Sequence, residues 1–478
     1  MTANADFLVS IPGLSPAAQS RFAELSGDTN PLHLDPIEAR RTLMGAPVVH
    51  GLHLVLLALE AGGAQVGTKL SALRARFPNP VLVGDRIEMR ITDDGGTHRR
   101  IEGYVQSDLV LDLTVSLGSD AAPDDMPMPS LEPEPLRDLR FSDLIGDSGS
   151  LQVGIDAVLA CSLFPAVIGS FGLPVVAELL ALTRLIGMRC PGRNSIFSQF
   201  DVTFDRSGIP GALHFRVTGA DERFLRINIQ VEGARLIGKL TAFFRPLPQS
   251  QPSMTELSKM VRPDEFRNCA ALVVGGSRGL GEATAKLLAA GGARVLLSYN
   301  SGERDATRVA AEITSWGGSC ECCRLNVLDS TETVRKIYAS AAPPRTIYYF
   351  ATPRIFSRRR KFLSQDLLEQ FIQYYVIGFS KLIDAAAAQS KMKLHIFVPS
   401  TVAIDESLRE IAEYSMAKRM AEDLCAFYNR FSDNAEITSV RLPRLKTDQT
   451  TTLIEIPALD CVEVMLPIVR RIELNLIS

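Results

Sequence analysis

The sequence predicts two α+β domains followed by an α/β domain built on a doubly wound parallel sheet. A length of 478 residues corresponds to about three domains at roughly 150 residues each. Two Pro-rich stretches, residues 121–134 and 245–262, have the composition of linkers. The first two segments each contain one apolar helix followed by strands of period two, whereas the third alternates strands with helices. The predicted domains span residues 1–122, 135–248 and 265–478.

Composition excludes several classes of protein. Hydrophobic residues make up 46% of the chain and charged residues 22%, which is typical of globular domains rather than disordered ones. A net charge of −3 provides no basic surface for nucleic acid. Eight cysteines are too few for a disulfide scaffold, and the N-terminus does not have the pattern of a signal peptide. We therefore expect a protein of the reducing cytoplasm that does not bind nucleic acid.

Residues 157–177 are uncharged and long enough to span a bilayer. Pro165, Gly169, Gly172 and Pro174 interrupt this stretch, and a Lys/Arg-rich flank is missing. We expect a loop that leads into a buried core helix, and no membrane association.

The first two segments look like weak copies of each other. An apolar helix is expected within Leu56–Gly67 of the first copy and within Leu179–Gly192 of the second. Because such a helix needs burial on most sides, an antiparallel sheet is expected to curl around it. This pattern resembles the hot-dog fold, and two copies in one chain resemble a double hot dog.

The third segment opens with a strand at Ala270–Val274, a Gly-rich turn and a helix over residues 281–290. Further strands are expected at residues 293–298, 347–350 and 394–398. Strands that alternate with helices indicate βαβ units and a Rossmann-like sheet.

Asp28 and His33 are the residues of the first segment with acid–base chemistry. They lie five positions apart across a turn that contains Pro31, so they can converge on one point. A carboxylate beside an imidazole suits the addition of water to a double bond and the elimination of water that forms one. One group activates or protonates the oxygen, and the other transfers the proton at the neighbouring carbon. The alternative for these residues alone is an Asx-type turn with a packed His33.

Three spaced groups of residues accompany this pair. The first group is Phe22, Leu25, Ser26, Gly27, Asp28, Asn30, Pro31, Leu32, His33 and Ala39; the second is Val48-Val49-His50-Gly51; the third is Phe77, Pro80, Val81, Gly84 and Asp85. Together they resemble the signature of the MaoC-like, (R)-specific enoyl-CoA hydratase family.

The resemblance implies that Asp28 and His33 are the catalytic pair and that the Gly51 N–H, at the start of the central helix, binds the thioester carbonyl. A helix N-terminus offers free N–H groups for such an oxygen. His50 and His53 are interpreted as structural. The second copy has no counterpart of the pair, so we expect a degenerate half that completes the fold and shapes the acyl tunnel.

A Gly-rich turn between the first strand and the first helix of the third segment predicts a nucleotide site. Gly275 permits a tight turn, Gly279 permits close approach of a pyrophosphate, and Gly281 permits helix–strand packing. The spacing resembles the short-chain dehydrogenase/reductase family, with Val274 in place of the usual Thr. The coenzyme-binding residues that this resemblance implies are Gly275, Ser277, Arg278, Gly279, Leu280, Gly281, Asn326, Val327 and Lys418.

Arg278 and the end of the second strand favour NADP(H) over NAD(H). That strand ends in Ser298-Tyr299-Asn300, without the acidic residue that binds a ribose 2′-hydroxyl. The Arg278 guanidinium is placed to pair with a 2′-phosphate.

Tyr414 and Lys418 match the Tyr-x-x-x-Lys motif of the same family. Four residues apart, they share a helical face, and a nearby ammonium is expected to lower the pKa of the phenol. Thr401 or Ser400 supplies the family's hydroxyl. The departures from the family pattern are Tyr349-Phe350-Ala351-Thr352 after the fourth strand, Tyr375 in place of a helix Asn, and Pro443-Arg444 in place of Pro-Gly.

Two other clusters carry no assigned chemistry. Cys320, Cys322 and Cys323 have no Cys/His partner pair nearby, so we expect thiols without a metal. The run Arg358–Lys361 is interpreted as a solvated face, with docking of an acidic carrier protein or of CoA phosphates as the alternative.

We therefore predict a bifunctional enzyme of fatty-acid or polyketide-like biosynthesis that acts on acyl-CoA or acyl carrier protein thioesters. The reductase half is expected to convert a 3-oxoacyl to a 3-hydroxyacyl thioester with NADPH, and the other half to act as dehydratase (hydratase). Two alternatives stay open: a dehydratase with an inactive or NADP-sensing Rossmann domain, and a non-enzymatic acyl- and NADP-binding regulator. Acyl length, direction and self-association through the Rossmann domain are also open.

Overall fold

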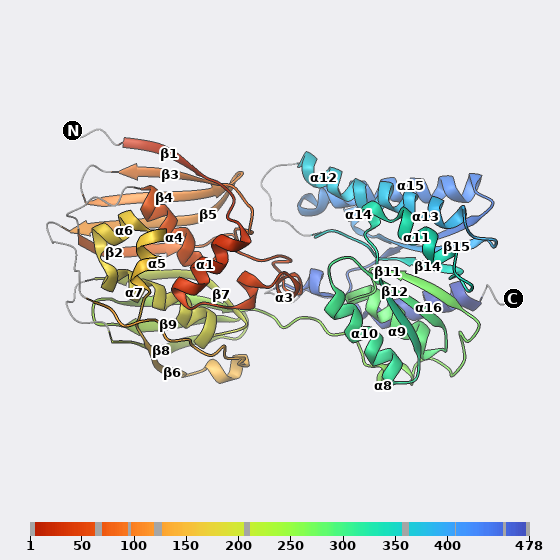
Figure 1. Ribbon diagram of the computed structural model, residues 1–478, viewed down its shortest axis with the longest axis horizontal. Helices are drawn as coiled ribbons and strands as arrows, with labels where there is room; N and C mark the ends of the chain where they lie inside the picture. Colours follow the sequence, from red (N-terminus) through yellow and green to blue (C-terminus); the bar gives the residue numbers. More distant parts are fainter. Residues whose placement is uncertain are drawn as a thin grey trace. The chain divides into compact units, whose positions relative to one another are not determined.

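The chain divides into two compact units in the computed structural model, Met1–Leu247 with Thr452–Ile454, and Pro248–Thr451 with Glu455–Ser478. Each unit has its own sheet and its own hydrophobic core (Figure 1). The structure describes residues 5–62, 69–93, 97–118, 127–204, 211–355, 363–406, 408–452 and 456–474.

The first unit contains one ten-stranded antiparallel sheet in the order β1-β3-β4-β5-β2-β7-β10-β9-β8-β6. Its two halves join where β2 pairs with β7, from Ala72 opposite Thr203 to Arg76 opposite Gln199. The strands are β1 (Ala5–Ile11), β2 (Lys69–Arg76), β3 (Ile87–Asp93), β4 (His98–Val105), β5 (Asp108–Gly118), β6 (Ser148–Gln152), β7 (Ser195–Thr203), β8 (Ala212–Asp221), β9 (Arg226–Glu232) and β10 (Ile237–Phe244).

The longer helices of this unit lie across one face of the sheet (Figure 1). The two central helices, α4 and α7, are buried in a single apolar core that also contains residues of both half-sheets. This is the double hot-dog arrangement that the sequence predicts. The helices are α1 (Pro16–Ser26), α2 (Pro31–Leu34), α3 (Pro36–Arg40), α4 (Gly51–Ala61), η1 (Phe141–Leu144), α5 (Ala157–Leu163), α6 (Pro165–Phe171), α7 (Leu173–Arg184) and η2 (Leu185–Arg189).

The stretch 157–177 differs from the loop expected before the second central helix. It forms α5 and α6 and then enters α7, with Pro165 at the start of α6 and Gly172 at its end. Gly172 has φ +79°, which ends α6 and turns the chain by 116° into the next helix. Among the described residues, no single helix is long and apolar enough to cross a membrane, although this bent pair of helices has the length and composition together.

The second unit contains a six-stranded sheet in the order β13-β12-β11-β14-β15-β16. All neighbouring strands are parallel, as the alternating pattern predicts. The strands are β11 (Ala270–Val274), β12 (Arg294–Tyr299), β13 (Ser319–Arg324), β14 (Thr346–Tyr349), β15 (Leu394–Thr401) and β16 (Ala435–Leu442).

Helices cover both faces of this sheet. One core packs α9, α10 and α16 against the strands, and a second core packs α11, α13 and α15. The doubly wound α/β fold is confirmed. The helices are α8 (Met254–Leu257), α9 (Gly279–Ala290), α10 (Glu303–Ser315), η3 (Val327–Asp329), α11 (Thr331–Tyr338), α12 (Gln365–Ile372), η4 (Gln373–Ile377), α13 (Gly378–Ala387), α14 (Ala403–Glu406), η5 (Arg409–Ile411), α15 (Ala412–Phe431), η6 (Asp448–Thr450) and α16 (Cys461–Leu474).

Candidate active sites

Asp28 lies in the short turn between α1 and α2. Helix α1 ends at Ser26 and is capped by Gly27, whose φ of +69° is the left-handed conformation that glycine adopts most easily. Asn30 caps α2 by accepting the Leu32 N–H at 3.0 Å, and Pro31 occupies the first helical position. Only residues 27–30 separate the two helices, so the two helix boundaries fix the backbone around Asp28.

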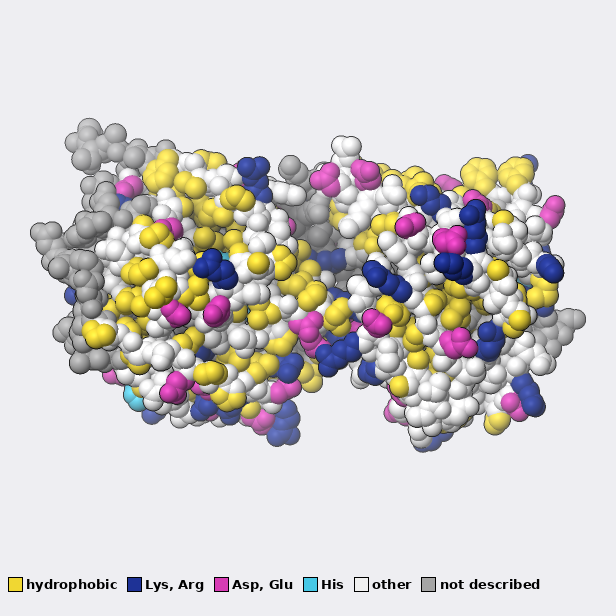
Figure 2. Space-filling view, viewed as in Figure 1, with side chains coloured by type: hydrophobic (Ala, Val, Ile, Leu, Met, Phe, Trp, Pro, Cys, Tyr) yellow, Lys and Arg dark blue, Asp and Glu magenta, His cyan; other side chains and the backbone are white. Residues whose placement is uncertain are grey.

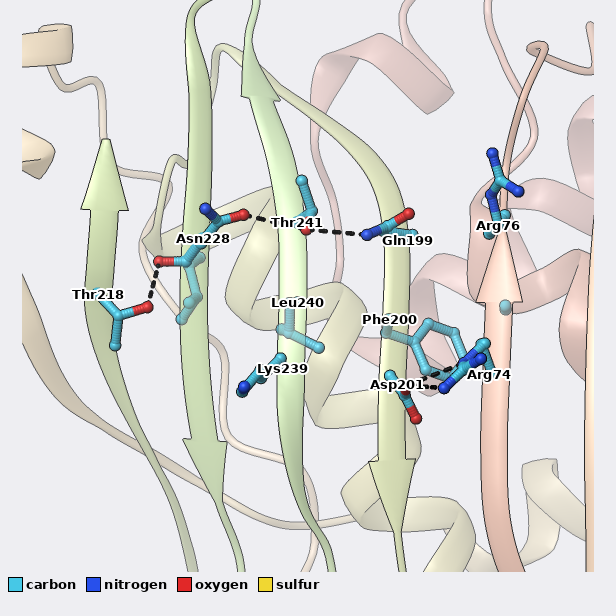
Figure 3. Close-up of a pocket in the computed structure, with 12 residues that line it drawn as sticks. Arg74, Arg76, Gln199, Phe200, Asp201, Thr218, Asn228, Lys239, Leu240 and Thr241 are labelled. Atoms are coloured by element: carbon cyan, nitrogen blue, oxygen red, sulfur yellow. Dashed lines mark hydrogen bonds and ion pairs between the residues drawn. The ribbon is translucent and has the colours of Figure 1, made fainter. Parts of the chain in front are cut away.

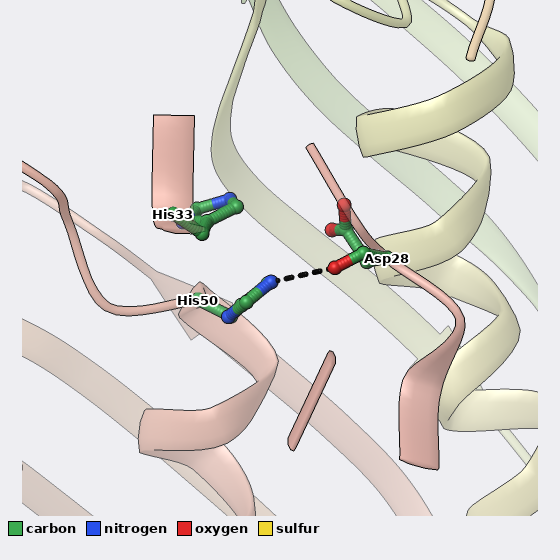
Figure 4. Close-up of side chains that lie close together, drawn as sticks. All are labelled: Asp28, His33 and His50. Atoms are coloured by element: carbon green, nitrogen blue, oxygen red, sulfur yellow. Dashed lines mark hydrogen bonds between the residues drawn. The ribbon is translucent and has the colours of Figure 1, made fainter. Parts of the chain in front are cut away.

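The turn brings Asp28 and His33 together with His50, the residue that precedes α4. A carboxylate oxygen of Asp28 and one ring nitrogen of each histidine lie within 4.8 Å of one another (Figure 4). Asp28 is buried, whereas His33 and Gly51 are partly exposed. The acid–base pair predicted from the sequence is therefore brought to one place, with His33 and Gly51 on its accessible side.

The hydrogen bonds of His33 leave one ring nitrogen free to act as a base. Its Nδ1 lies 2.8 Å from the carbonyl oxygen of Val48, which can only accept, so Nδ1 carries the proton. The Nε2 atom then has a lone pair. Burial lowers the pKa of His33 despite the opposing charge of Asp28, and it raises the pKa of Asp28 despite His33 and the hydrogen bond from Thr183. An imidazole that stays neutral thus faces a carboxyl group that holds its proton more tightly than usual.

His50 fixes the turn from the other side. Its Nε2–H donates to the backbone carbonyl oxygen of Asp28 at 3.0 Å, and its ring stacks on His33 with 3.7 Å between centroids. The spacing of the three side chains also fits a metal ion, but this hydrogen bond requires the proton on His50 Nε2 and leaves no lone pair there for a metal. The contacts of His50 agree with the structural role expected for it.

Gly51 and His53 belong to the first turn of α4. Helix α4 begins at Gly51 without a side-chain cap, so its first N–H groups stay available to a ligand. A Cβ at Gly51 would lie 2.8 Å from the ring of Phe77, so a larger residue there would require this ring to move. His53 donates from Nδ1 to Gln19 at 2.7 Å and stacks on Phe22, away from the pair.

Three residues that the sequence analysis did not single out contact the Asp28 turn, and all come from the second hot-dog half. The Thr183 hydroxyl donates to Asp28 Oδ2 at 2.7 Å. Arg184 is buried beside Gly27, and Gly187 lies against the Asp28 carboxylate. Their sequence carries no recognisable motif, and only the pairing of the two halves reveals them.

The Gly-rich turn of the second unit connects β11 to α9. Gly275 and Gly279 have φ of +79° and +54°, and a Cβ at Gly281 would lie 2.3 Å from the carbonyl oxygen of Gly275. Helix α9 begins at Gly279 without a side-chain cap from Arg278. Open N–H groups and the absence of side-chain bulk fit a pyrophosphate at this helix end. Ser277 is buried and Leu280 partly exposed in the same turn.

Arg278 has a carboxylate partner that the sequence did not suggest. Its Nη1 lies 3.5 Å from Oδ2 of Asp448, on the segment that follows β16. The backbone N–H of Gln249, at the start of this unit, donates to Oδ1 of the same carboxylate at 2.8 Å. Arg278 is thus engaged by an intramolecular anion next to the Gly-rich turn.

Asn326 and Val327 follow the edge strand β13. The Asn326 side chain accepts the Leu328 N–H and caps η3, and Val327 is buried against α13. Cys320 and Cys323 lie on β13 itself, where burial raises the thiol pKa to about 12 and about 11. Both thiols stay protonated at neutral pH. The run Arg358–Lys361 lies outside the described residues.

Tyr414 lies beside Thr401 rather than beside Ser400. Its hydroxyl is hydrogen-bonded to Thr401, while Ser400 donates to the carboxylate of Glu422. Burial raises the pKa of Tyr414 to about 12, which differs from the expected lowering by a neighbouring ammonium. Of the two candidate hydroxyls, the structure brings Thr401 to the tyrosine.

Lys418 explains this difference. Its Nζ donates to the Pro399 carbonyl oxygen at 2.6 Å and lies 4.1 Å from the ring centre of Tyr375, but 5.9 Å from that of Tyr414. Burial lowers the pKa of Lys418 to about 7. The hydroxyls of Thr352 and Tyr375, at two of the positions that depart from the family pattern, are hydrogen-bonded to each other. Thr352 and Tyr375 are therefore joined to each other, and the ring of Tyr375 lies beside Lys418.

A cavity of about 490 Å³ lies elsewhere, on the outer face of the ten-stranded sheet around the β2–β7 seam (Figure 3). Exposed Arg74 pairs with Asp201 at 2.6 Å there, and Gln199, Thr241 and Asn228 form a hydrogen-bonded row. None of the predicted site residues lines this cavity.

Two family models match the chain, one in each unit. The model of the MaoC like domain matches residues 6–112, and that of the short chain dehydrogenase matches residues 269–424. The chain therefore combines a MaoC-like dehydratase domain with a short-chain dehydrogenase domain, as its two resemblances indicate.

Several curated relatives match parts of these domains. The (R)-specific enoyl-CoA hydratase of Aeromonas caviae is 40% identical over 78 residues, 16% of this chain and 58% of the relative. The peroxisomal hydratase-dehydrogenase-epimerase of Saccharomyces cerevisiae is 34% identical over 77 residues, 16% of this chain and 8% of the relative. The 3-oxoacyl-[acyl-carrier-protein] reductase of Synechocystis is 44% identical over 62 residues, 13% of this chain and 25% of the relative. The chain thus spans less than two thirds of each relative.

Among solved structures, the angucycline C-6 ketoreductase LanV with bound NADP is 17% identical, with a TM-score of 0.38. The match covers 43% of this chain and 89% of that structure.

Proposed function

We propose that this chain is a bifunctional acyl-thioester enzyme, an NADPH-dependent 3-oxoacyl reductase joined to a 3-hydroxyacyl dehydratase (enoyl hydratase). The observation that carries the proposal is the convergence of Asp28 and His33 within 4.8 Å, next to the uncapped helix start at Gly51. An acid, a base and an oxygen-binding helix end are the groups that elimination beside a thioester needs.

The dehydratase half removes water across C2 and C3 of a 3-hydroxyacyl thioester. The Nε2 lone pair of His33 takes the proton from C2, and the carboxyl of Asp28 gives its proton to the departing C3 hydroxyl. The electron pair of the C2–H bond forms the new double bond, and the Gly51 N–H stabilises the negative charge on the thioester oxygen. The opposite pKa changes of the two groups support this division of roles. Hydration is the same path in reverse.

The residues of the Gly-rich turn fit a dinucleotide, and Arg278 favours NADP(H). Gly275, Gly279 and the start of α9 would hold the pyrophosphate, with Arg278 directed to the 2′-phosphate. The coenzyme, when bound, supplies the hydride that reduces the C3 carbonyl.

The reductase half needs a proton for the reduced oxygen, and Tyr414 provides it. Its hydroxyl, held by Thr401, donates to the substrate oxygen. Lys418 lies on the next turn of the same helix, and its contacts with the Pro399 carbonyl oxygen and the Tyr375 ring favour its charged form, against the effect of burial.

The two reactions are consecutive, since the 3-hydroxyacyl product of the reductase is the substrate of the dehydratase. Substrates on CoA and on an acyl carrier protein both present this thioester. The proposal is tested by incubating the full chain with a short 3-oxoacyl-CoA and NADPH. It predicts the oxidation of NADPH followed by formation of the trans-2-enoyl thioester, and the absence of both products contradicts it.

The outer face of α15 supports self-association of the second unit. Met416, Met420, Phe427 and Phe431 lie exposed along this helix at spacings of four and seven, and hydrophobic side chains are visible over its end (Figure 2). A second copy of the chain is the proposed partner. Phe427→Asp is expected to lower the mass measured by light scattering, and an unchanged mass contradicts this partner.

A further inference from the structure

The catalytic carboxylate of the first hot-dog half is held by the second half. Thr183, on α7, donates its hydroxyl hydrogen to Asp28 Oδ2 at 2.7 Å, and both side chains are buried. The Asn30 N–H, at 3.3 Å, binds Oδ1. Thr183 therefore provides the closer of these two hydrogen bonds on a group that the proposed elimination uses.

Gly187 provides the space for this carboxylate. It belongs to η2, the π-helical turn that follows α7, and a Cβ at Gly187 would lie 2.1 Å from Asp28 Oδ1. Its carbonyl oxygen accepts a hydrogen bond from Asn30 Nδ2 at 2.8 Å, which ties the turn of the first half to the same glycine. Because any side chain here would displace the carboxylate, position 187 is constrained by Asp28.

Arg184 adds a charge to the same surface. It is buried, its chain passes close to Gly27, and its guanidinium donates to the carbonyl oxygen of Gln152. The titratable and charged groups that face Asp28 are His33, His50 and Arg184. Thr183, Arg184 and Gly187 together form a socket for Asp28.

The equivalent position on the central helix of the first half, α4, has a structural contact instead of a catalytic group. The repeats Leu56–Leu59 and Leu179–Leu182 place Glu60 of α4 at the position that Thr183 occupies in α7. The Glu60 carboxylate accepts the N–H groups of Ala166 and Val167, both at 3.0 Å, at the start of α6. The two equivalent positions therefore differ in role. Thr183 of α7 binds the catalytic carboxylate of Asp28, whereas Glu60 of α4 caps the start of α6.

We propose that Thr183 and Gly187 are positioning residues, through which the half without its own acid–base pair holds the catalytic carboxylate of the other half in its working orientation. This inference rests on the proposed dehydratase function. It gives the degenerate half a role in the chemistry in addition to completing the fold.

The test compares Thr183→Val and Thr183→Ser in the full chain, using hydration of a short trans-2-enoyl-CoA. Valine keeps the shape and removes the hydroxyl, so kcat is expected to fall roughly 10- to 100-fold with little change in KM. The pH–rate profile should move to higher pH, because a hydrogen bond that favours the ionised carboxylate is lost. Thr183→Ser should restore most of the activity and the profile. Ser170→Ala, which removes another buried hydroxyl of the second half, should leave both unchanged.

A second variant tests whether the Asp28 carboxylate needs the space that the missing side chain of Gly187 leaves. Gly187→Ala should lower kcat at least as much as Thr183→Val while thermal unfolding still shows a folded chain. Two results overturn the inference but not the proposed function, provided that the wild type is active. The first is an unchanged kcat and pH profile in Thr183→Val, and the second is a loss of activity that Thr183→Ser does not restore. A wild type that hydrates no enoyl thioester contradicts the proposed function and this inference with it.

Discussion

The imidazole of His33 stacks on that of His50 with 3.7 Å between ring centroids and 24° between planes. Each ring donates one hydrogen bond to a backbone carbonyl oxygen, His33 to Val48 and His50 to Asp28. Two protonated rings this close would repel each other, and burial already lowers the pKa of both. The stack therefore requires neutral rings at working pH, which is the state in which His33 can accept a proton.

Acid is expected to destabilise the first unit. Burial lowers the pKa of His53 to about 3 and that of His50 well below 6.5, so these two side chains bind more protons in the unfolded chain than in the folded one below pH 6.5. Stability from these groups is complete above pH 6.5 and is lost as the pH falls. Urea unfolding at pH 7 and pH 5 should give a lower free energy of unfolding at pH 5. His53→Met should reduce the difference, and equal stability at both pH values contradicts the assignment.

Asp28→Asn is expected to separate the two proposed activities and to change stability. Loss of the acid–base group should lower hydration of an enoyl thioester by roughly 100-fold or more, while NADPH oxidation with a 3-oxoacyl thioester continues. Because burial raises the pKa of Asp28 above 3.8, ionisation of this group opposes folding above that pH. The variant should therefore unfold at a higher urea concentration than the wild type at pH 7. Hydration at the wild-type rate contradicts the site.

Tyr414→Phe should have the opposite effect on activity. Reduction is expected to fall by roughly 100-fold or more and hydration to persist, because the two sites belong to different units. Thr401→Val should also impair reduction, since Thr401 is the hydroxyl bonded to Tyr414. Ser400→Ala is the matched control, because Ser400 faces Glu422 instead. A larger loss with Ser400→Ala than with Thr401→Val would reverse the assignment of the hydroxyl.

Arg278 and Asp448 should control coenzyme affinity in opposite directions. Arg278→Ala is expected to weaken NADPH binding roughly 10- to 100-fold with little effect on NADH. Asp448→Asn removes the competing anion 3.5 Å away and should tighten NADPH binding by about fivefold. Titration calorimetry with NADPH, NADH and 2′,5′-ADP measures both effects. Equal loss of NADPH and NADH binding in Arg278→Ala contradicts a 2′-phosphate contact.

Local sequence patterns were sufficient for the groups that lie close together in the chain. The Asn30-Pro31 start of α2 and the Gly51 start of α4 are encoded in a few adjacent residues, and so is the Gly-rich turn before α9. The parallel sheet and the two apolar central helices follow from periodicity in the same way.

Local sequence patterns could not predict the contacts between residues far apart in the chain. Thr183 is 155 positions from Asp28, and Asp448 is 170 positions from Arg278, so no local spacing relates them. Gly187 lies in a π-helical turn, which no local spacing indicates, and Lys418 Nζ lies over the ring of Tyr375. Pairing of the halves and of the helices decides these details.

The central claim is that Asp28 and His33 act on the intermediate that Tyr414 helps to form. The direct measurement follows a short 3-oxoacyl-CoA with NADPH by chromatography, in the wild type and in Asp28→Asn. The wild type should form the trans-2-enoyl thioester, whereas the variant should oxidise NADPH equally fast and stop at the 3-hydroxyacyl thioester. Formation of the enoyl product by Asp28→Asn at the wild-type rate contradicts the account.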